Sequence, residues 1–274
     1  MNARLGHAKI CQDCSDRLSG LANKILEYSV RYDSLRDKRA VFAFMYSRMT
    51  DDLAKYIAGD YMAFGDPEWV TGLASTFARR FLNAMDSIDT WLGEKDQATT
   101  LPAIYECVPK PWADVYQAIQ GKKSYVLEDM IFSMMAHISY DLPLALLELN
   151  TESGKVGDIA DYQKMNQVLA GNIDDIQKVV AHRYSRLLSF LDDFAGSYDE
   201  FLTNYGIRVA RAVAWYNFDR ISNPGSKADA IRSIESSTDA FVSSVRSPEA
   251  WWAKLALRIA RLLIPERRRW PRLA

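Results

Sequence analysis

Residues 133–144 read Ser133-Met-Met-Ala-His-Ile-Ser-Tyr-Asp-Leu-Pro-Leu144 and lie inside an otherwise apolar, helical pattern. A helix turns through about 100° per residue, so His137 and Asp141 share one face, one turn apart. Pro143 has no N–H and disfavours the α conformation of the residue before it. We therefore expect a central, buried helix over about 124–150 that kinks or restarts at this proline.

Helical spacing extends over the rest of the chain, and no alternating strand-like runs are joined by Asn-Gly or Asp-Gly. The sequence predicts an all-α fold, a single multi-helix, bundle-like domain spanning 1–274 with a proline-kinked central helix. Asp66-Pro67-Glu68 indicates a helix start. A long connection over 93–123 should hold at most a short helix after Pro111. Further helices are expected at about 13–30, 36–58, 67–92, 158–170, 173–195, 197–221, 227–245 and 248–264.

The composition is that of a globular protein with balanced charge. The 274 residues are 49% hydrophobic and carry a net charge of −1, which gives no general preference for nucleic acid. Three cysteines are too few for a disulfide framework. We find neither a secretory signal nor a run of about 18 uncharged apolar residues. These features predict a soluble, cytoplasmic protein.

The C-terminal tail differs from the rest of the chain. From Arg246 onward it holds eight Lys or Arg and two Glu, a local excess of +6 that leaves −7 on the remainder. Residues 248–270 combine an apolar stripe with basic side chains and tryptophans, which suits weak, peripheral contact with an anionic membrane. The alternative is that this helix docks its apolar face on the domain.

His137 has two interpretations. In the first, its nitrogens are satisfied within a packed core and Asp141 caps the helix that restarts near Pro143. In the second, Asp141 fixes the tautomer of His137 and raises its basicity, as a general base or a metal ligand requires. Two side chains do not complete a metal site. Candidates to complete one with a divalent ion are Glu128, Asp161, Asn166 and His182.

Several motifs in order along the chain resemble a bacterial family that is known only as a domain of unknown function and is common in actinobacteria. The resemblance covers about 45–220. It rests on Met49-Thr50, Phe64-x-Asp66-Pro67-x-Trp69-Val70, Phe77-Ala78-x-Arg80-Phe81, Pro111-Trp112, Ala136-His137-Ile138-x-x-Asp141-Leu142-Pro143, Asp161-Tyr162-x-x-Met165-Asn166 and Arg211-x-x-Ala214-Trp215.

The resemblance implies that His137, Asp141, Asp161 and Asn166 converge on one site, with His137, Asp141 and Asp161 as the metal-binding set if a metal is bound. One position departs from the family pattern. Met135 stands where the family usually has Asn, so an amide contact to a ligand or metal is missing. The resemblance implies a site and leaves the reaction open.

Two further motifs have simpler explanations. Asp192-Asp193-Phe194 with Asp199-Glu200 is similar to the magnesium-binding cluster of terpene cyclases. The carboxylates, however, are six residues apart across Gly196-Ser197, and a solvated helix end explains them. Cys11-x-x-Cys14 has the spacing of a zinc or redox pair but lacks a second pair, so an ordinary N-terminal helix is favoured.

The leading functional hypothesis is a small-molecule enzyme, a hydrolase, lyase or cyclase, that uses His137 oriented by Asp141. Arg80, Trp112, Tyr140 and Trp215 are expected to line its substrate pocket, with Phe77, Phe81 and Phe132 as further apolar walls. Arg80 has a second interpretation, as a structural ion pair with Asp66, Asp141 or Asp161. The alternative function is non-catalytic binding of a hydrophobic metabolite or lipid, and a terpene-cyclase-like enzyme is a third option.

Overall fold

The fold was analysed on a computed structural model that describes residues 2–59, 64–95, 103–120, 125–155, 157–184, 204–246 and 270–271. These residues form helices and contain no strand, so the predicted all-α class is confirmed. The elements are α1 (Asn2–Leu35), α2 (Arg39–Gly59), α3 (Pro67–Lys95), α4 (Ile104–Cys107), α5 (Lys110–Gln120), α6 (Val126–Ala136), the π-helix η1 (His137–Asp141), α7 (Leu142–Ser153), α8 (Ile159–Tyr184), α11 (Asn204–Ser222) and α12 (Lys227–Arg246).

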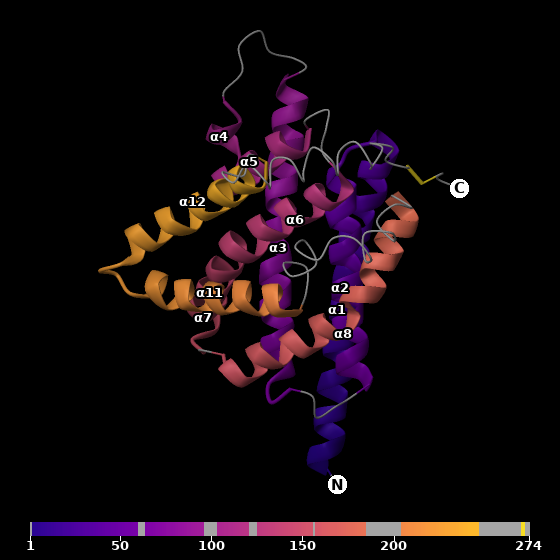
Figure 1. Cartoon of the computed structure of the whole chain (residues 1–274). Coiled ribbons are helices and arrows are strands. Elements are labelled where there is room, and N and C mark those ends of the chain that lie inside the picture. The colour runs from indigo at the N-terminus through magenta and orange to yellow at the C-terminus, as the bar shows by residue number, and fades with distance from the viewer. Residues whose placement is uncertain are drawn as a thin grey trace.

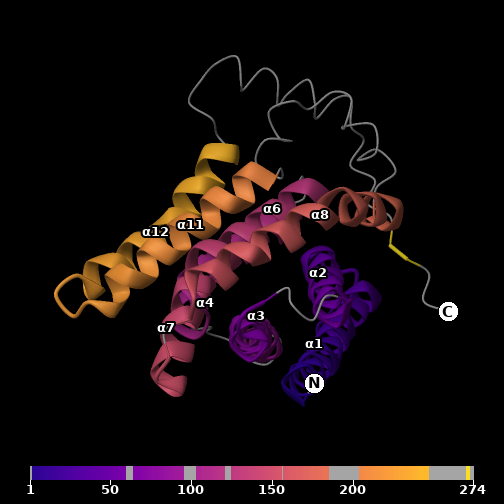
Figure 2. The same cartoon turned by 90° about the horizontal axis from the view of Figure 1, so that it is seen from below.

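The helices are arranged in two groups (Figures 1 and 2). Helices α1, α2 and α3 lie side by side, and α6, α7, α8, α11 and α12 form a curved layer over them. In the curved layer, α11 and α12 form a hairpin whose turn contains Asn223-Pro224-Gly225. The core therefore lies between the long N-terminal helices and the curved layer.

The start of α3 follows its predicted signature. The Asp66 carboxylate accepts the backbone N–H of Trp69 at 2.9 Å, and Pro67 occupies the first helical position, where no N–H is needed. Asp161 reinforces this corner from the beginning of α8. Its two carboxylate oxygens accept the backbone N–H groups of Gly65 at 2.8 Å and Asp66 at 2.7 Å. The α3 start is thus fastened to α8 by side chain to backbone hydrogen bonds.

Several predicted boundaries are wrong. The helix expected at 13–30 is α1, which begins at Asn2 and ends at Leu35. The expected helices at 158–170 and 173–195 are joined in one helix, α8, which continues through Gly171, and residues 185–195 lie outside the described residues. A helical glycine costs only about 1 kcal/mol relative to alanine, and tertiary packing overrides that cost.

The connection after α3 holds an 11-residue helix, α5, which begins at Lys110, before Pro111. Proline is tolerated there because the first turn of a helix has no intrahelical N–H bonds to lose. The connection after α3 also holds the short helix α4, which comes before Pro111. The prediction for 248–264 lies outside the described residues.

The central helical stretch is buried. By length and composition alone, Glu128–Ser153 could cross a membrane, but 72% of its most apolar window is covered by the rest of the fold. That coverage is typical of a core helix in a globular protein, and it makes the membrane signal weak.

Two clusters of buried hydrophobic side chains make up most of the core. One gathers around α2, α5 and α6 and the middle of α3, and the other around the first turns of α3 with α7, α8 and α11. Phe77 and Ile138 pack against both clusters. The junction between the clusters is where His137 lies.

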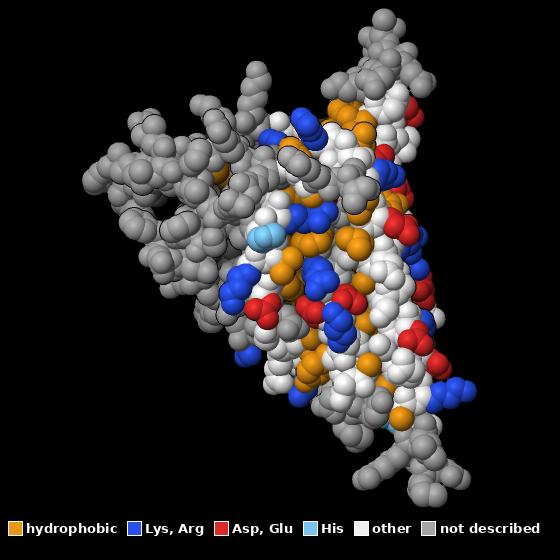
Figure 3. Space-filling model, turned by 90° about the vertical axis from the view of Figure 1, so that its right-hand side faces the viewer, with side chains coloured by type: hydrophobic (Ala, Val, Ile, Leu, Met, Phe, Trp, Pro, Cys, Tyr) orange, Lys and Arg blue, Asp and Glu red, His pale blue; other side chains and the backbone are white. Residues whose placement is uncertain are grey.

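The outer surface carries interleaved charges. On the face that α1, α2 and α8 form, Lys and Arg side chains alternate with Asp and Glu (Figure 3). This face presents no extended patch of a single sign, in agreement with the net charge of −1.

Candidate functional site

His137 begins a single π-helical turn between α6 and α7. The N–H of Leu142 donates to the carbonyl of His137, five residues earlier. Pro143 has no N–H to donate to the Ser139 carbonyl. A π turn, with hydrogen bonds between residues five apart, accommodates this loss within the helix. Leu142 nevertheless keeps helical dihedrals, φ −65° and ψ −47°, contrary to the prediction that Pro143 would push it out of the α conformation. The predicted interruption is present, but it takes the form of a π turn.

The predicted pair of His137 and Asp141 forms directly. Nδ1 of His137 lies 2.9 Å from Oδ2 of Asp141, and both side chains are buried. The same oxygen accepts Nε1–H of Trp112 at 2.9 Å, and Nε of Arg80 lies 3.7 Å from Oδ1. Because the carboxylate accepts, Nδ1 of His137 carries the proton and Nε2 carries the lone pair. Nε2 has no hydrogen-bond partner among the described residues.

Burial keeps His137 neutral. Desolvation lowers the pKa of the imidazole below its ordinary 6.5, although the hydrogen bond and charge of Asp141 act to raise the pKa, and the charge of Arg80 lowers it further. Aromatic rings enclose the side chain. Phe77 stacks on the imidazole with ring centroids 3.5 Å apart and planes 4° apart, and Tyr46 meets it edge-on at 4.6 Å. A neutral, oriented imidazole in an aromatic shell is the result.

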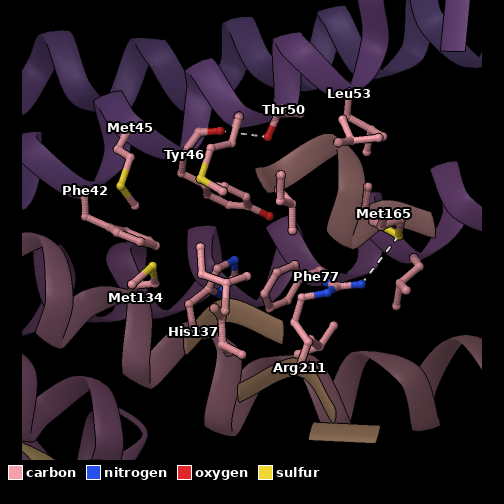
Figure 4. Close-up of a pocket in the computed structure, with 18 residues that line it drawn as sticks. Phe42, Met45, Tyr46, Thr50, Leu53, Phe77, Met134, His137, Met165 and Arg211 are labelled. Carbon is pink, nitrogen blue, oxygen red and sulfur yellow. Dashed lines mark hydrogen bonds between the residues drawn. The ribbon is translucent and has the colours of Figure 1, made fainter. Parts of the chain in front are cut away.

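A cavity of about 80 Å³ lies beside His137, at the junction of the two core clusters (Figure 4). Helices α2, α3, α6, α7, α8 and α11 and the π turn all contribute to its wall, which is largely apolar and includes Phe42, Met45, Met49, Ala74, Phe77 and Met165. A single water needs only about 10–15 Å³. The cavity therefore has room for a compact organic molecule.

Four polar side chains join this wall among the described residues: Tyr46, Thr50, His137 and Arg211. The Thr50 hydroxyl is occupied, because it donates to the carbonyl of Tyr46 at 2.9 Å. Tyr46 reaches into the cavity from α2, and Arg211 enters from the opposite side on α11 (Figure 4). Burial raises the pKa of Tyr46 well above 10, so its hydroxyl stays protonated and can donate a hydrogen bond.

Arg211 is a buried cation held by neutral groups. Only 3% of its surface is exposed. Its Nε donates to Oδ1 of Asn166 at 2.6 Å, and Nη2 donates to the carbonyl of Tyr162 at 3.1 Å and lies 3.8 Å from Sδ of Met165. The guanidinium also lies 4.2 Å from the centre of the Tyr162 ring. Burial lowers the pKa of Arg211.

The four residues expected to converge have different roles in the structure. His137 lines the cavity, and Asp141 lies behind it as its hydrogen-bond partner. Asn166 does not line the cavity but holds Arg211, which does. Asp161 fastens the start of α3 with both of its oxygens.

The expected metal-binding set is not assembled. The described residues contain no group of three or more His, Cys, Asp or Glu side chains placed to hold a metal ion. Asp161 is committed to backbone N–H groups, Glu128 accepts the N–H of Tyr125 at 3.0 Å, and His182 is exposed. Cys11 and Cys14 are buried in α1 and form no disulfide bond among the described residues, as the interpretation of an ordinary helix predicts. The acidic cluster at Asp192, Asp193, Asp199 and Glu200 lies outside the described residues.

The expected substrate-pocket residues lie elsewhere. Arg80 pairs with Asp141 and with Glu148, at 3.2 Å, as its structural interpretation predicted. Trp112 donates a hydrogen bond to Asp141. Tyr140 packs beside the small core cluster of α11 and α12, and Trp215 packs on Tyr162 and Phe218. Of the aromatic walls that the sequence suggested, Phe77 lines the cavity, whereas Phe81 and Phe132 do not.

Sequence reasoning missed three polar residues of the wall, Tyr46, Thr50 and Arg211. For Arg211 the signal was present in α11, where Ile207, Arg211, Ala214 and Phe218 recur at helical spacing and are all buried. A lone arginine on an apolar helical face predicts a buried cation.

Comparison with protein-family models finds one match: the model of DUF5995, a family of unknown function, matches residues 21–248. The matched range is wider than the 45–220 expected from the motifs and contains every residue of the cavity wall. Neither the curated proteins nor the solved structures yielded a match.

Proposed function

We propose that this chain, which belongs to the DUF5995 family of unknown function, binds a compact apolar molecule in the cavity beside His137. The cavity itself carries the proposal. Protein cores are packed as densely as organic crystals, and voids larger than a water molecule are few. At about 24 cal/mol per Å³, an empty space of 80 Å³ costs about 2 kcal/mol of stability. An apolar occupant would recover that free energy by restoring dispersion contacts.

The residues that form the wall favour ligand binding over an accidental packing defect. Methionines at positions 45, 49, 134 and 165 surround the space. Unbranched thioether side chains adapt to irregular ligands and are frequent at sites that accept varied apolar partners. The aromatic rings of Tyr46 and Phe77, which pack on His137, form another part of the wall. A wall that combines adaptable thioether side chains with packed aromatic rings is suited to a small hydrophobic ligand.

Filling the cavity tests this function. Ala74 lines the wall, so Ala74→Leu places extra methyl groups in the void. Wild-type protein should gain about 5–10 °C in Tm with hexan-1-ol at about 100-fold its Kd. Ala74→Leu should show no such gain, and its ligand-free Tm should equal or exceed that of the wild type. Ala212→Leu, at an exposed position on α11, is the matched control and should respond like the wild type.

Either of two results would contradict the proposal. One is an absence of any response in the wild type across a panel of compact apolar compounds. The other is an equal response in Ala74→Leu, which would place binding outside the cavity.

A second candidate function, general-base catalysis on the bound molecule, is favoured by the state of His137. Its Nδ1 proton is held by Asp141, and its Nε2 lone pair has no partner among the described residues. An imidazole with this tautomer and a lowered pKa is a competent base at neutral pH.

Hydrolysis of p-nitrophenyl acetate tests the catalytic candidate. His137→Asn retains a donor toward Asp141 but removes the base, so we expect the esterase rate to fall by about 100-fold or more. His182→Asn, at an exposed histidine, should leave the rate unchanged. Equal rates for wild type and His137→Asn would reject catalysis and leave the binding function intact.

A further inference from the structure

We infer that the ligand of the cavity is an apolar monocarboxylate whose carboxylate pairs with Arg211. This inference rests on the proposed binding function and names its ligand class. It is carried by a buried guanidinium that lines the cavity without a carboxylate partner among the described residues.

Other arginines of the same fold show what Arg211 lacks. Arg39, which is as deeply buried, pairs with Asp37 and Asp89, each at 2.7 Å. Arg183 pairs with Asp33 at 2.6 Å, and Arg80 with Glu148 at 3.2 Å. In the part of the chain that the structure describes, each of these three arginines therefore forms an ion pair with a carboxylate.

The partners of Arg211 among the described residues are neutral and do not compensate its charge. An amide oxygen, a backbone carbonyl and a thioether occupy Nε and Nη2, and the face of Tyr162 supports the guanidinium. Arginine does not deprotonate in proteins, so the cation persists in the apolar surroundings. A buried charge of this kind is strongly unfavourable unless an opposite charge reaches it.

One further nitrogen of Arg211, Nη1, has no acceptor in the described part of the chain, although Nε and Nη2 are both engaged. Asn166 fixes the orientation of the guanidinium plane through its bond to Nε. An oriented guanidinium with an open nitrogen is suited to a carboxylate, which it binds in a directional, charge-assisted hydrogen bond.

The rest of the wall defines the ligand's other properties. Among the described residues, the wall holds one cation, Arg211, and a neutral Tyr46 hydroxyl, so it matches a ligand with a single negative charge. A phosphate monoester would carry nearly two negative charges. The remaining surface is apolar, which requires a hydrocarbon body. The volume of 80 Å³ is far below the roughly 300–1,000 Å³ of sites for drug-sized ligands. A short aliphatic acid or a benzoate-sized aromatic acid meets all three conditions.

Calorimetric titration with acids and their neutral amides tests the inference. Wild-type protein should bind hexanoate or benzoate at least about tenfold more tightly than hexanamide or benzamide at pH 7. Comparing the two acids separates an aliphatic from an aromatic ligand. This arm needs no variant.

Substitution of Arg211 tests whether its guanidinium is the group that binds the carboxylate. In Arg211→Met, we expect the affinity for the acid to fall at least about tenfold and the affinity for the amide to change less than about twofold. Arg211→Lys keeps the charge but loses the planar fork and should give an intermediate loss. Arg208→Met, at an exposed arginine on the same helix, should bind like the wild type.

The outcomes separate the two proposals. Equal affinities for acid and amide, or an Arg211→Met variant that binds the acid as the wild type does, would overturn the carboxylate and leave apolar binding standing. Failure of all four compounds and of hexan-1-ol to bind would overturn both. Circular dichroism must show helical content like that of the wild type for each variant, and if Arg211→Met fails this test, the acid and amide affinities of the wild type decide.

Discussion

At the scale of single residues, Asp141 organises the neighbourhood of the cavity. One buried carboxylate accepts from His137 and Trp112 and lies beside Arg80. Removing a hydrogen-bond donor from a buried carboxylate leaves its charge less compensated than before. The orientation of His137 therefore depends on groups that do not themselves reach the cavity.

Trp112→Phe should measure that dependence. The substitution keeps an aromatic ring but removes the Nε1–H donated to Asp141, so we expect a loss of about 1–3 kcal/mol in the free energy of unfolding. Urea denaturation provides the value. Trp215→Phe is the control, because the Trp215 indole packs against the rings of Tyr162 and Phe218 and donates no hydrogen bond to a described residue. Equal losses in both variants would show that the hydrogen bond to Asp141 contributes nothing specific.

The lowered pKa of His137 predicts a pH dependence of stability. The unfolded chain takes up a proton near 6.5, whereas the folded imidazole resists protonation to a lower pH. Below 6.5 the unfolded state binds more protons, so stability should fall as the pH decreases, and above 6.5 this contribution is constant. His137→Asn should flatten the slope between pH 6.5 and 5 relative to wild type, and His182→Asn should not. An unchanged slope in His137→Asn would contradict the burial account.

The residue scale also shows what sequence can predict. The pairing of His137 with Asp141 follows from spacing alone, because a separation of four is a neighbour relation on a helix. The partners of Asp161 and Arg211 come from other helices, so no local pattern gives them. The chemistry of a carboxylate predicts a ligand role for Asp161, yet its two oxygens accept two backbone N–H groups. Those N–H groups lie about 95 positions away in the sequence, so spacing along the chain does not predict the contact.

At the scale of elements, helix-start signals proved more reliable than helix breaks. Asp66-Pro67 predicted the start of α3, because capping is a local interaction. Gly171 failed as a stop signal, because the packing of α8 outweighs a small propensity cost. Pro143 was correctly identified as a disturbance, but a π turn absorbs it without moving Leu142 out of the helical region.

Gly157 provides a test of how α8 is joined to α3. A Cβ atom at this position would lie 1.7 Å from Cε2 of the Trp69 indole, which is buried. Gly157→Ala must therefore displace the indole or the loop, and we expect it to destabilise the protein by about 1–3 kcal/mol. Gly171→Ala, in an exposed helical position with nothing within 4 Å, should instead gain up to about 1 kcal/mol. Thermal unfolding of both variants measures whether their changes in stability have opposite signs. A stabilising effect of Gly157→Ala would refute the close packing of Gly157 against Trp69.

At the scale of the whole molecule, the cavity lies where two core clusters meet, so several helices from both layers contribute to its wall. No single segment of sequence could reveal it, because its residues come from α2, α3, α8 and α11 as well as from the central stretch. The fold class was predictable from periodicity, whereas a void depends on how side chains from distant helices fit together. The basic segment 248–270 lies outside the described residues, and its membrane contact stays a prediction, as does cytoplasmic localisation.

A crystal structure of the wild-type protein grown with saturating hexanoate or benzoate would show whether the acid occupies the cavity. We expect ligand density inside the cavity, with the hydrocarbon against Phe77 and the methionines and the carboxylate within hydrogen-bond distance of Arg211. Density confined to the protein surface, or a cavity that remains empty at saturation, would contradict this expectation.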